Sequence, residues 1–300
     1  MANDRADFAP DFRNSAWWSG DSRMAANGRA NEAIMQKLGM MERPDLSQVE
    51  AVQMGHVMQP VIARLTTDRL GLELKDADYP LTHEKETWMR SHFDYITTDG
   101  KTLVECKNYG IHQRNKFDVE ANIIPSADMA QLIHECAVHG VEHIYLAVLF
   151  GGQEFCTFEF RITQQQKDDL IKEMAEYWGR VRMNNPMPPE TVEQAKVLYA
   201  QERGGSVLAN QQVERACMSL KQLKANIKAL EEQEEQLTVA IQNVIQHNAE
   251  LLSVDGTVLA TWKGSKPTKR FDSKLFQSSM PDIYDKFVVE SAGSRRFLVK

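Results

Sequence analysis

Hydrophobic and polar positions predict a sequence of helices and strands in the first two thirds of the chain. Apolar side chains recur at helical spacing between Ser47 and Gly71, where Pro60 predicts a kink and Gly71 an end. Residues 87–97 and 101–108 flank Asp99-Gly100, a dipeptide that strongly favours a two-residue hairpin turn. A strand, a turn and a second strand are therefore expected over residues 87–108.

The next segments continue the alternation of helices and strands. A helix is expected over residues 126–139, a buried strand over 144–150 and its partner over 154–162. Thr163 and Gln166 form a capping box in front of a helix over residues 164–182. This order predicts an α/β fold, with a mixed sheet flanked by helices.

A proline-rich segment, residues 186–189, predicts a linker between two domains, 1–185 and 186–300. Beyond it, a heptad pattern runs from Leu220 to Val244 and is interrupted by Glu234. Fewer than four clean heptads favour a helical hairpin with residues 190–203 over a long two-chain coiled coil. After Asp255-Gly256 a short β-rich tail is expected, with nine basic and four acidic residues.

Composition limits the classes of protein that this chain can represent. The 300 residues carry a net charge of −7, which argues against a protein that coats nucleic acid but allows a local basic groove. The start lacks the order of a signal peptide, there is no apolar run long enough to span a membrane, and four cysteines form no CxxC pair. We therefore expect a cytoplasmic protein with reduced thiols and no membrane contact.

Two acids are predicted to face each other across the hairpin. A two-residue turn at Asp99-Gly100 places Asp94 opposite Glu105 and His92 opposite Lys107, all on one face. Opposed ionised carboxylates repel one another unless a cation lies between them, and all-oxygen ligands suit Mg²⁺ or Mn²⁺. Lys107 could then orient or deprotonate a water molecule, or stabilise negative charge on a phosphate.

An acid two residues before a lysine is not specific by itself. Composition alone gives about 2.5 occurrences by chance, and the chain has four. Only Glu105-Cys106-Lys107 has an Asp across a predicted hairpin and a following helix. A surface patch of cross-strand salt bridges is the alternative interpretation of these residues.

Four motifs in order resemble the PD-(D/E)xK nuclease core, and more closely the phage lambda exonuclease and YqaJ-like viral recombinase family. They are Gly55-His-Val-Met-Gln59, Phe93-Asp94, Leu103-Val-Glu105-Cys-Lys107 and Met129-Ala-Gln131. The resemblance extends over roughly residues 10–300, because Thr261-Trp-Lys263 and Arg296-Phe297 also resemble the tail of the YqaJ-like branch.

The resemblance implies Asp94, Glu105 and the backbone carbonyl of Cys106 as metal ligands, Lys107 as the catalytic lysine and Gln131 as the residue that orients the water or the phosphate. Gln59 stands where the family has a metal-binding Glu, so a nearby acid such as Glu50 would have to substitute, a single metal would have to suffice, or activity would be reduced. A 5′-phosphate pocket is expected from Arg13 with Ser19 or Ser22. Arg114 and Lys116 are candidates for contacts with the DNA backbone.

The function implied is a Mg²⁺-dependent exonuclease that digests double-stranded DNA ends in the 5′-to-3′ direction for phage-type recombination. The resemblance also implies a homo-oligomer, a trimeric ring, and a single-strand annealing protein as partner. One alternative is a non-catalytic DNA-end-binding or scaffold protein on a nuclease fold; another is an endonuclease with the same chemistry. His134, Cys136, His139 and His143 lack the spacing of a zinc site, and no phosphate-binding glycine motif occurs.

Overall fold

The computed structural model describes residues 10–77, 79–289 and 293–300. The chain divides into two compact units, Met1–Tyr199 and Ala200–Lys300. The first seven residues, on which the expectation of no signal peptide rests, lie outside the described residues. Within the described part of the chain, no helix is both long and apolar enough to cross a lipid bilayer.

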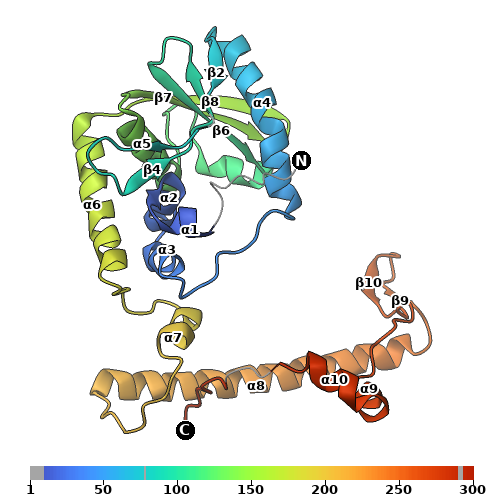
Figure 1. Ribbon diagram of the computed structural model, residues 1–300. Helices are drawn as coiled ribbons and strands as arrows, with labels where there is room; N and C mark the ends of the chain where they lie inside the picture. Colours follow the sequence, from blue (N-terminus) through green and yellow to red (C-terminus); the bar gives the residue numbers. More distant parts are fainter. Residues whose placement is uncertain (1–9, 78, 290–292) are drawn as a thin grey trace. The chain divides into compact units, whose positions relative to one another are not determined.

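A mixed five-stranded sheet forms the centre of the first unit (Figure 1), with the strand order β2-β5-β6-β7-β8. Its strands are β2 (Leu74–Asp76), β5 (Tyr95–Thr97), β6 (Thr102–Tyr109), β7 (His143–Phe150) and β8 (Glu154–Arg161). Only β6 and β7 are parallel, and the helix between them, α5 (Ser126–His139), makes the crossover. The predicted α/β class with a mixed, helix-flanked sheet is confirmed.

Helices cover both faces of this sheet. On one face, Ile62 of α4 (Glu50–Leu70) packs with Val104 and Leu149. On the other face, Leu132 of α5 packs with Leu103 and Leu146. Gly71 and Gly140 end the two helices at φ values of 66° and 85°, a backbone region that glycine adopts without strain.

A second apolar layer lies outside α5. It is built by α2 (Ser19–Ala26), α3 (Ala30–Lys37) and α6 (Gln164–Arg182), around Trp17, Ile34 and Met174. The predicted capping box at Thr163 and Gln166 is present at the start of α6. Three short helices also belong to the unit: α1 (Pro10–Asn14), the 3-10 helix η2 (Ile111–Lys116) and α7 (Val192–Leu198).

The prediction of a single strand over residues 87–97 is wrong, because these residues form two strands that belong to two different sheets. Its first part, β4 (Met89–Ser91), belongs to a three-stranded sheet with β1 (Trp17–Trp18) and β3 (Leu81–Thr82). The backbone N–H of Trp17 donates to the carbonyl of Trp88 at 2.7 Å. This contact spans about seventy residues, so no local pattern indicates it.

The division between the units falls at Tyr199, beyond the proline-rich segment at which we placed the linker. Asn31 explains the difference, since its side chain accepts a hydrogen bond from the Met187 N–H and donates to the carbonyl of Pro188 and to Gln194. Residues 186–199 are thereby attached to α3 of the first unit.

The second unit has one long helix, α8 (Gln211–Ile245), followed by the hairpin of β9 (Glu250–Leu252) and β10 (Val258–Thr261). Two short helices, α9 (Ser273–Ser279) and α10 (Pro281–Tyr284), and the 3-10 helix η3 (Asp285–Phe287) come after it. The predicted helical hairpin needs two helices of comparable length, whereas the structure has a seven-residue α7 in the first unit and the 35-residue α8 in the second. The predicted β-rich tail is corrected in the same way, since most of its regular structure is helical.

Candidate active site

The hairpin between β5 and β6 has the register that the turn predicts. Tyr95 pairs with Val104 and Ile96 with Leu103, which brings Asp94, just before β5, to the level of Glu105. The Oδ2 atom of Asp94 accepts a hydrogen bond from the backbone N–H of Cys106 at 2.8 Å. Asp94 is therefore fixed against β6 at the predicted position.

His92 does not lie opposite Lys107 in a strand ladder, because the β5–β6 ladder contains only the two pairs. Its ring stacks on Trp18 instead, with the ring centroids 5.2 Å apart and an interplanar angle of 15°. The chain leaves the central sheet before residue 94 in order to form β4. Of the four residues predicted on one face, His92 is thus the one that is directed elsewhere.

Glu105 and Lys107 lie two residues apart on β6 and share one face of the strand. The Lys107 Nζ atom donates to the Oε1 atom of Glu105 at 2.5 Å. Gln131, on α5, donates through Nε2 to the same oxygen at 2.7 Å. Glu105 is only 5% exposed, so an ammonium group and an amide together compensate its burial.

Gln59 reaches the same cluster from α4. Its Nε2 atom donates to the Oδ1 atom of Asp94 at 2.6 Å, so both oxygens of Asp94 have hydrogen-bond donors. Glu50 opens α4 nine residues earlier, which is roughly 13 Å along the helix axis. Glu50 therefore does not substitute for the acid that the family has at position 59.

Glu135 is a member of the cluster that the sequence analysis missed. It is 1% exposed, and its Oε1 atom accepts from the Gln131 Nε2 atom at 2.8 Å. Gln131 and Glu135 are four residues apart on α5, a spacing that places two side chains on the same helix face. That spacing was the available signal for a third acid at the site.

Burial and like charges raise the pKa values of two acids in this cluster. Burial and, next, the charge of Glu105 raise the pKa of Asp94 well above its usual range. The same two causes raise the pKa of Glu135. Burial would lower the pKa of Lys107, but Glu105, Tyr109 and Asp94 outweigh it and raise that pKa, so the ammonium stays charged. The Lys107 ammonium thus lies among three acids, of which Glu105 and Glu135 are buried.

The resemblance implies a metal ion held by the oxygen atoms of this cluster. The described residues contain no group of three or more His, Cys, Asp or Glu side chains arranged to hold a metal ion. Asp94 and Glu105 still offer carboxylate oxygens close together, at a place where burial and the charge of Glu105 raise the pKa of Asp94. An all-oxygen set of this kind fits Mg²⁺ or Mn²⁺, with the remaining positions left to amide, backbone or water oxygens.

Arg23, Tyr109 and Asp128 extend the cluster along β6 and α5. Tyr109 follows Lys107 on the same strand face, and its hydroxyl donates to Asp128 at 2.8 Å. Arg23, on α2, donates to Asp128 at 3.0 Å and to the Tyr109 oxygen at 2.9 Å. Its partners lie 86 and 105 residues away, so the sequence analysis did not identify this half-buried guanidinium beside the acids.

The residues predicted to form a 5′-phosphate pocket are engaged in packing. Arg13 lies with its guanidinium carbon 4.9 Å from the centre of the Trp18 ring, and Ser19 is buried. Ser22 is fully buried and bonds the Nδ1 atom of His134 at 2.8 Å, while the Nε2 atom of His134 lies 3.1 Å from the Arg90 carbonyl. The structure does not bring Arg13 and Ser22 together with the acid cluster. Trp17 and Trp18 are buried and pack in the core.

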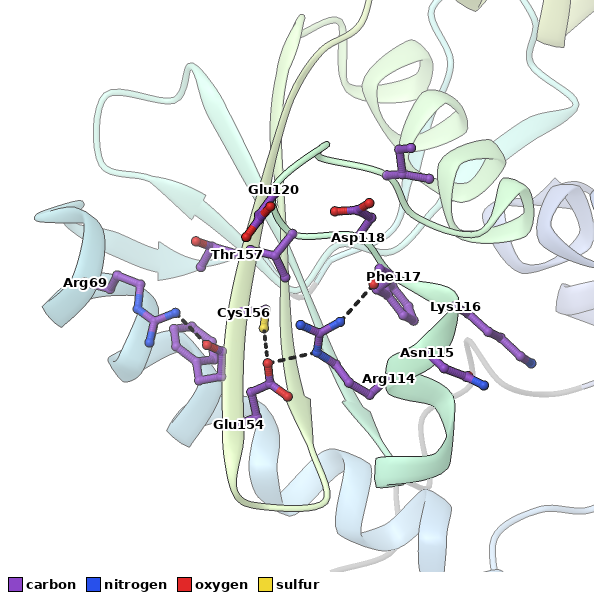
Figure 2. A pocket seen from close by; sticks show the side chains of 13 residues that line it. Arg69, Arg114, Asn115, Lys116, Phe117, Asp118, Glu120, Glu154, Cys156 and Thr157 are labelled. Carbon is purple, nitrogen blue, oxygen red and sulfur yellow. Dashed lines mark hydrogen bonds and ion pairs between the residues drawn. The ribbon is translucent and has the colours of Figure 1, made fainter.

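Arg114 and Lys116, the candidates for contacts with the DNA backbone, lie on η2. They line a hollow beside β8, and Figure 2 shows the Arg114 side chain directed at Glu154 and the Lys116 side chain directed away from it. Arg114 donates to Glu154 and to the Phe117 carbonyl, both at 2.8 Å. The hollow also contains Asp118 and Glu120, so its cations are balanced by acids.

The fold and the cluster define a class: a mixed α/β core that presents an Asp, a Glu-x-Lys and a Gln on adjoining strands and a helix, as the PD-(D/E)xK resemblance implies. Comparison with protein families narrows this class to one family. Residues 24–142 match the family model of the YqaJ-like viral recombinase domain, which confirms the predicted resemblance. This stretch contains Gln59, Asp94, Glu105, Lys107 and Gln131.

A curated relative and several solved structures are similar to this chain. An uncharacterized protein of Bacillus subtilis (strain 168), YqaJ, is 25% identical over 265 residues, which are 85% of this chain and 80% of that protein. An alkaline exonuclease of Laribacter hongkongensis is 12% identical with a TM-score of 0.46, over 57% of this chain and 90% of that one. A phage-related exonuclease of Haemophilus somnus is 12% identical with a TM-score of 0.41, over 54% and 82%.

Proposed function

We propose that this chain is a metal-dependent deoxyribonuclease whose active site is the cluster of Asp94, Glu105, Lys107 and Gln131. One observation carries the proposal: Glu105, the charged Lys107 and Gln131 form one hydrogen-bonded group, and the Cys106 N–H holds Asp94 against the same strand. The match of residues 24–142 to the YqaJ-like viral recombinase domain supports it.

Each residue has a definite part in phosphodiester hydrolysis. Mg²⁺ or Mn²⁺, held by Asp94 and Glu105, would supply Lewis acidity to the scissile phosphate. The Lys107 ammonium is placed to neutralise the negative charge that grows on the phosphate oxygens. Gln131 holds the Glu105 carboxylate and, by resemblance, orients the attacking water or the phosphate. The Cys106 N–H holds Asp94 in place.

The proposed substrate is a double-stranded DNA end, degraded from 5′ to 3′, and the product is a single strand for an annealing protein. We also propose that the nuclease units form a ring of three, as in the family that the chain resembles. Both statements rest on the resemblance. Arg23 is the cation of the described residues that best suits a contact with the phosphate next to the cut, because it borders Tyr109 and is 37% exposed.

The experiment that tests this proposal compares DNA ends and topologies in one assay. The full chain is incubated with linear duplexes bearing 5′-phosphate, 5′-hydroxyl or blocked ends, and with closed circular DNA, with and without Mg²⁺. We expect stepwise shortening of the 5′-phosphate duplex only with Mg²⁺, and an intact circle. A cut circle would make the enzyme an endonuclease.

A non-catalytic DNA-end binder is the second candidate, and Gln59 is the observation that favours it. Where the family has an acid, this neutral side chain donates a hydrogen bond to Asp94. Binding of duplex ends without any change in DNA length, over hours and at every Mg²⁺ or Mn²⁺ concentration, would establish that candidate and exclude the nuclease.

A further inference from the structure

The long helix α8 carries an apolar stripe that the other described elements of its own unit leave exposed. It has 35 residues, about 52 Å of helix. Its stripe repeats every seven residues, with Val213, Leu220, Ile227, Glu234 and Ile241 at one position and Ala216, Leu223, Leu230, Leu237 and Val244 at the other. Leu223, Leu230 and Leu237 are 57%, 63% and 67% exposed. We call these ten residues the α8 seam.

A seven-residue repeat of this length is the pattern of a helix that winds around another helix. A helix in water gains most of its stability from packing of its apolar face, so the seam requires a partner of comparable length. The other helices of the second unit, α9 and α10, have seven and four residues. The longest described helix after α8 is α4, whose 21 residues are too few to match the seam and whose Ile62 packs on the sheet.

The seam itself indicates what the partner is, because it is symmetric about a point between Lys228 and Ala229. About that point Ile227 mirrors Leu230 and Leu223 mirrors Glu234. The outer positions mirror one another as Leu220 with Leu237, Ala216 with Ile241 and Val213 with Val244. The point is also the middle of the helix. Two antiparallel copies of α8 would therefore overlap along their whole length with every seam position opposed.

Charge selects the antiparallel orientation. Residues 211–228 carry four basic residues and one acid, whereas residues 229–245 carry four acids and no base. Antiparallel pairing places the basic half of one helix beside the acidic half of the other. Parallel pairing places the two basic halves together and the two acidic halves together. Lys224 and Glu231 border the seam on the same side, so in the antiparallel pair each lies beside the other residue of the second copy.

Glu234, which interrupts the seam, has a place in this arrangement. In a parallel pair the two Glu234 side chains would meet inside the seam, an arrangement that costs free energy. In the antiparallel pair each Glu234 faces Leu223 of the second copy, next to Lys224. A polar residue at one seam position commonly fixes the orientation of paired helices at some cost in stability.

We propose that α8 is a self-association element that joins two copies of this chain as an antiparallel coiled coil. This interface is separate from any ring formed by the nuclease units and does not depend on the proposed activity. It doubles the number of chains per particle. If the nuclease units form a ring of three, the particle has six chains; if they do not associate, it has two.

The first experiment measures particle mass by sedimentation of the full chain at micromolar concentration. Ile227→Glu, which buries an acid opposite Leu230, is compared with Gln222→Glu on the outer face of the same helix. We expect the mass of the Ile227→Glu particle to be half that of the wild type and of Gln222→Glu. Equal masses for all three proteins, or a monomeric wild type, would overturn the proposal.

Charge exchange provides a readout that does not depend on the fold of a disrupted helix. Lys224→Glu and Glu231→Lys each turn two attractive pairs into repulsive ones, so each variant should weaken association about tenfold. The double variant restores opposite charges, and we expect its dissociation constant to return to within about threefold of the wild type. If the double variant associates more weakly than either single variant, the antiparallel register is contradicted.

Disulfide trapping tests the orientation directly. Leu220→Cys and Leu237→Cys chains are prepared in a Cys217→Ser background, because Cys217 is the exposed native cysteine among those described. Mixed and oxidised, they should form a disulfide between a Leu220→Cys chain and a Leu237→Cys chain. If disulfides between two Leu220→Cys chains form as fast as the mixed disulfide, the helices pair in parallel and the proposal is refuted.

Discussion

Glu105 of β6 is an acid and only 5% exposed, whereas Leu230 of α8 is apolar and 63% exposed. In the first unit the buried charges find their partners within the chain, through Lys107, Gln131 and Gln59. In the second unit the apolar stripe finds no partner within the described part of that unit. The comparison teaches that the first unit holds a complete polar site, while the second holds half of an interface.

The largest expected effect is in the acid cluster, where activity and stability should change in opposite directions. Asp94→Asn keeps an oxygen for the Cys106 N–H but removes a charge that burial and Glu105 disfavour. We expect DNA digestion to fall on the order of a thousandfold, because a ligand and a charge are lost at the reacting phosphate. The melting temperature should stay the same or rise. A large fall in melting temperature would mean that Asp94 has a structural role.

The next effect concerns His134, which is buried between Ser22 and the Arg90 carbonyl. Burial lowers its pKa from 6.5 to about 4, so the unfolded chain binds a proton more readily between those values. The contribution of His134 to the free energy of unfolding should therefore be at its maximum above pH 6.5. It should fall by about 3 kcal/mol as the pH decreases to about 4. Urea unfolding followed by tryptophan fluorescence measures it. His134→Gln should flatten this dependence, and an unchanged slope would contradict the assignment.

A smaller effect is expected at Gln59. Gln59→Glu places another acid against Asp94, which should lower the melting temperature without metal and increase the affinity for Mg²⁺ about tenfold. Melting curves over a Mg²⁺ titration measure both quantities. Gln53→Glu, on an exposed position of the same helix, is the matched control and should show neither change. Identical Mg²⁺ dependence in wild type and Gln59→Glu would argue against a metal site at Asp94.

The smallest expected effect sharpens the comparison between the units. Ile227→Glu should leave the digestion rate per chain within about twofold of the wild type, because no residue of the acid cluster comes from α8. The same variant halves the particle mass if the α8 seam pairs two chains. Loss of digestion in Ile227→Glu would show that the two units depend on one another.

The parts of the fold that were predicted from sequence depend on local signals. Asp99-Gly100 sets the register that brings Asp94 to Glu105, and Gly71 and Gly140 end their helices because their backbone conformation suits glycine. Those signals act within a few residues, so a single sequence contains them.

The parts that were missed depend on contacts between distant residues. The pairing of Trp17 with Met89 splits the predicted strand, and Asn31 moves the division of the chain to Tyr199. Arg23 meets Asp128 across 105 residues. The seven-residue repeat indicates that a helix needs a partner helix, but it does not identify that partner. The prediction of a hairpin with residues 190–203 therefore had no support from the repeat itself.

The central claim is that Lys107 and its acids hydrolyse DNA, and one measurement tests it most directly. Initial rates of digestion of a linear 5′-phosphate duplex with Mg²⁺ are compared for the wild type, Lys107→Ala and Lys101→Ala, which removes an exposed lysine six residues earlier. We predict wild-type rates for Lys101→Ala and a loss of at least roughly a hundredfold for Lys107→Ala, with both proteins folded. Digestion by folded Lys107→Ala at the wild-type rate would contradict the account.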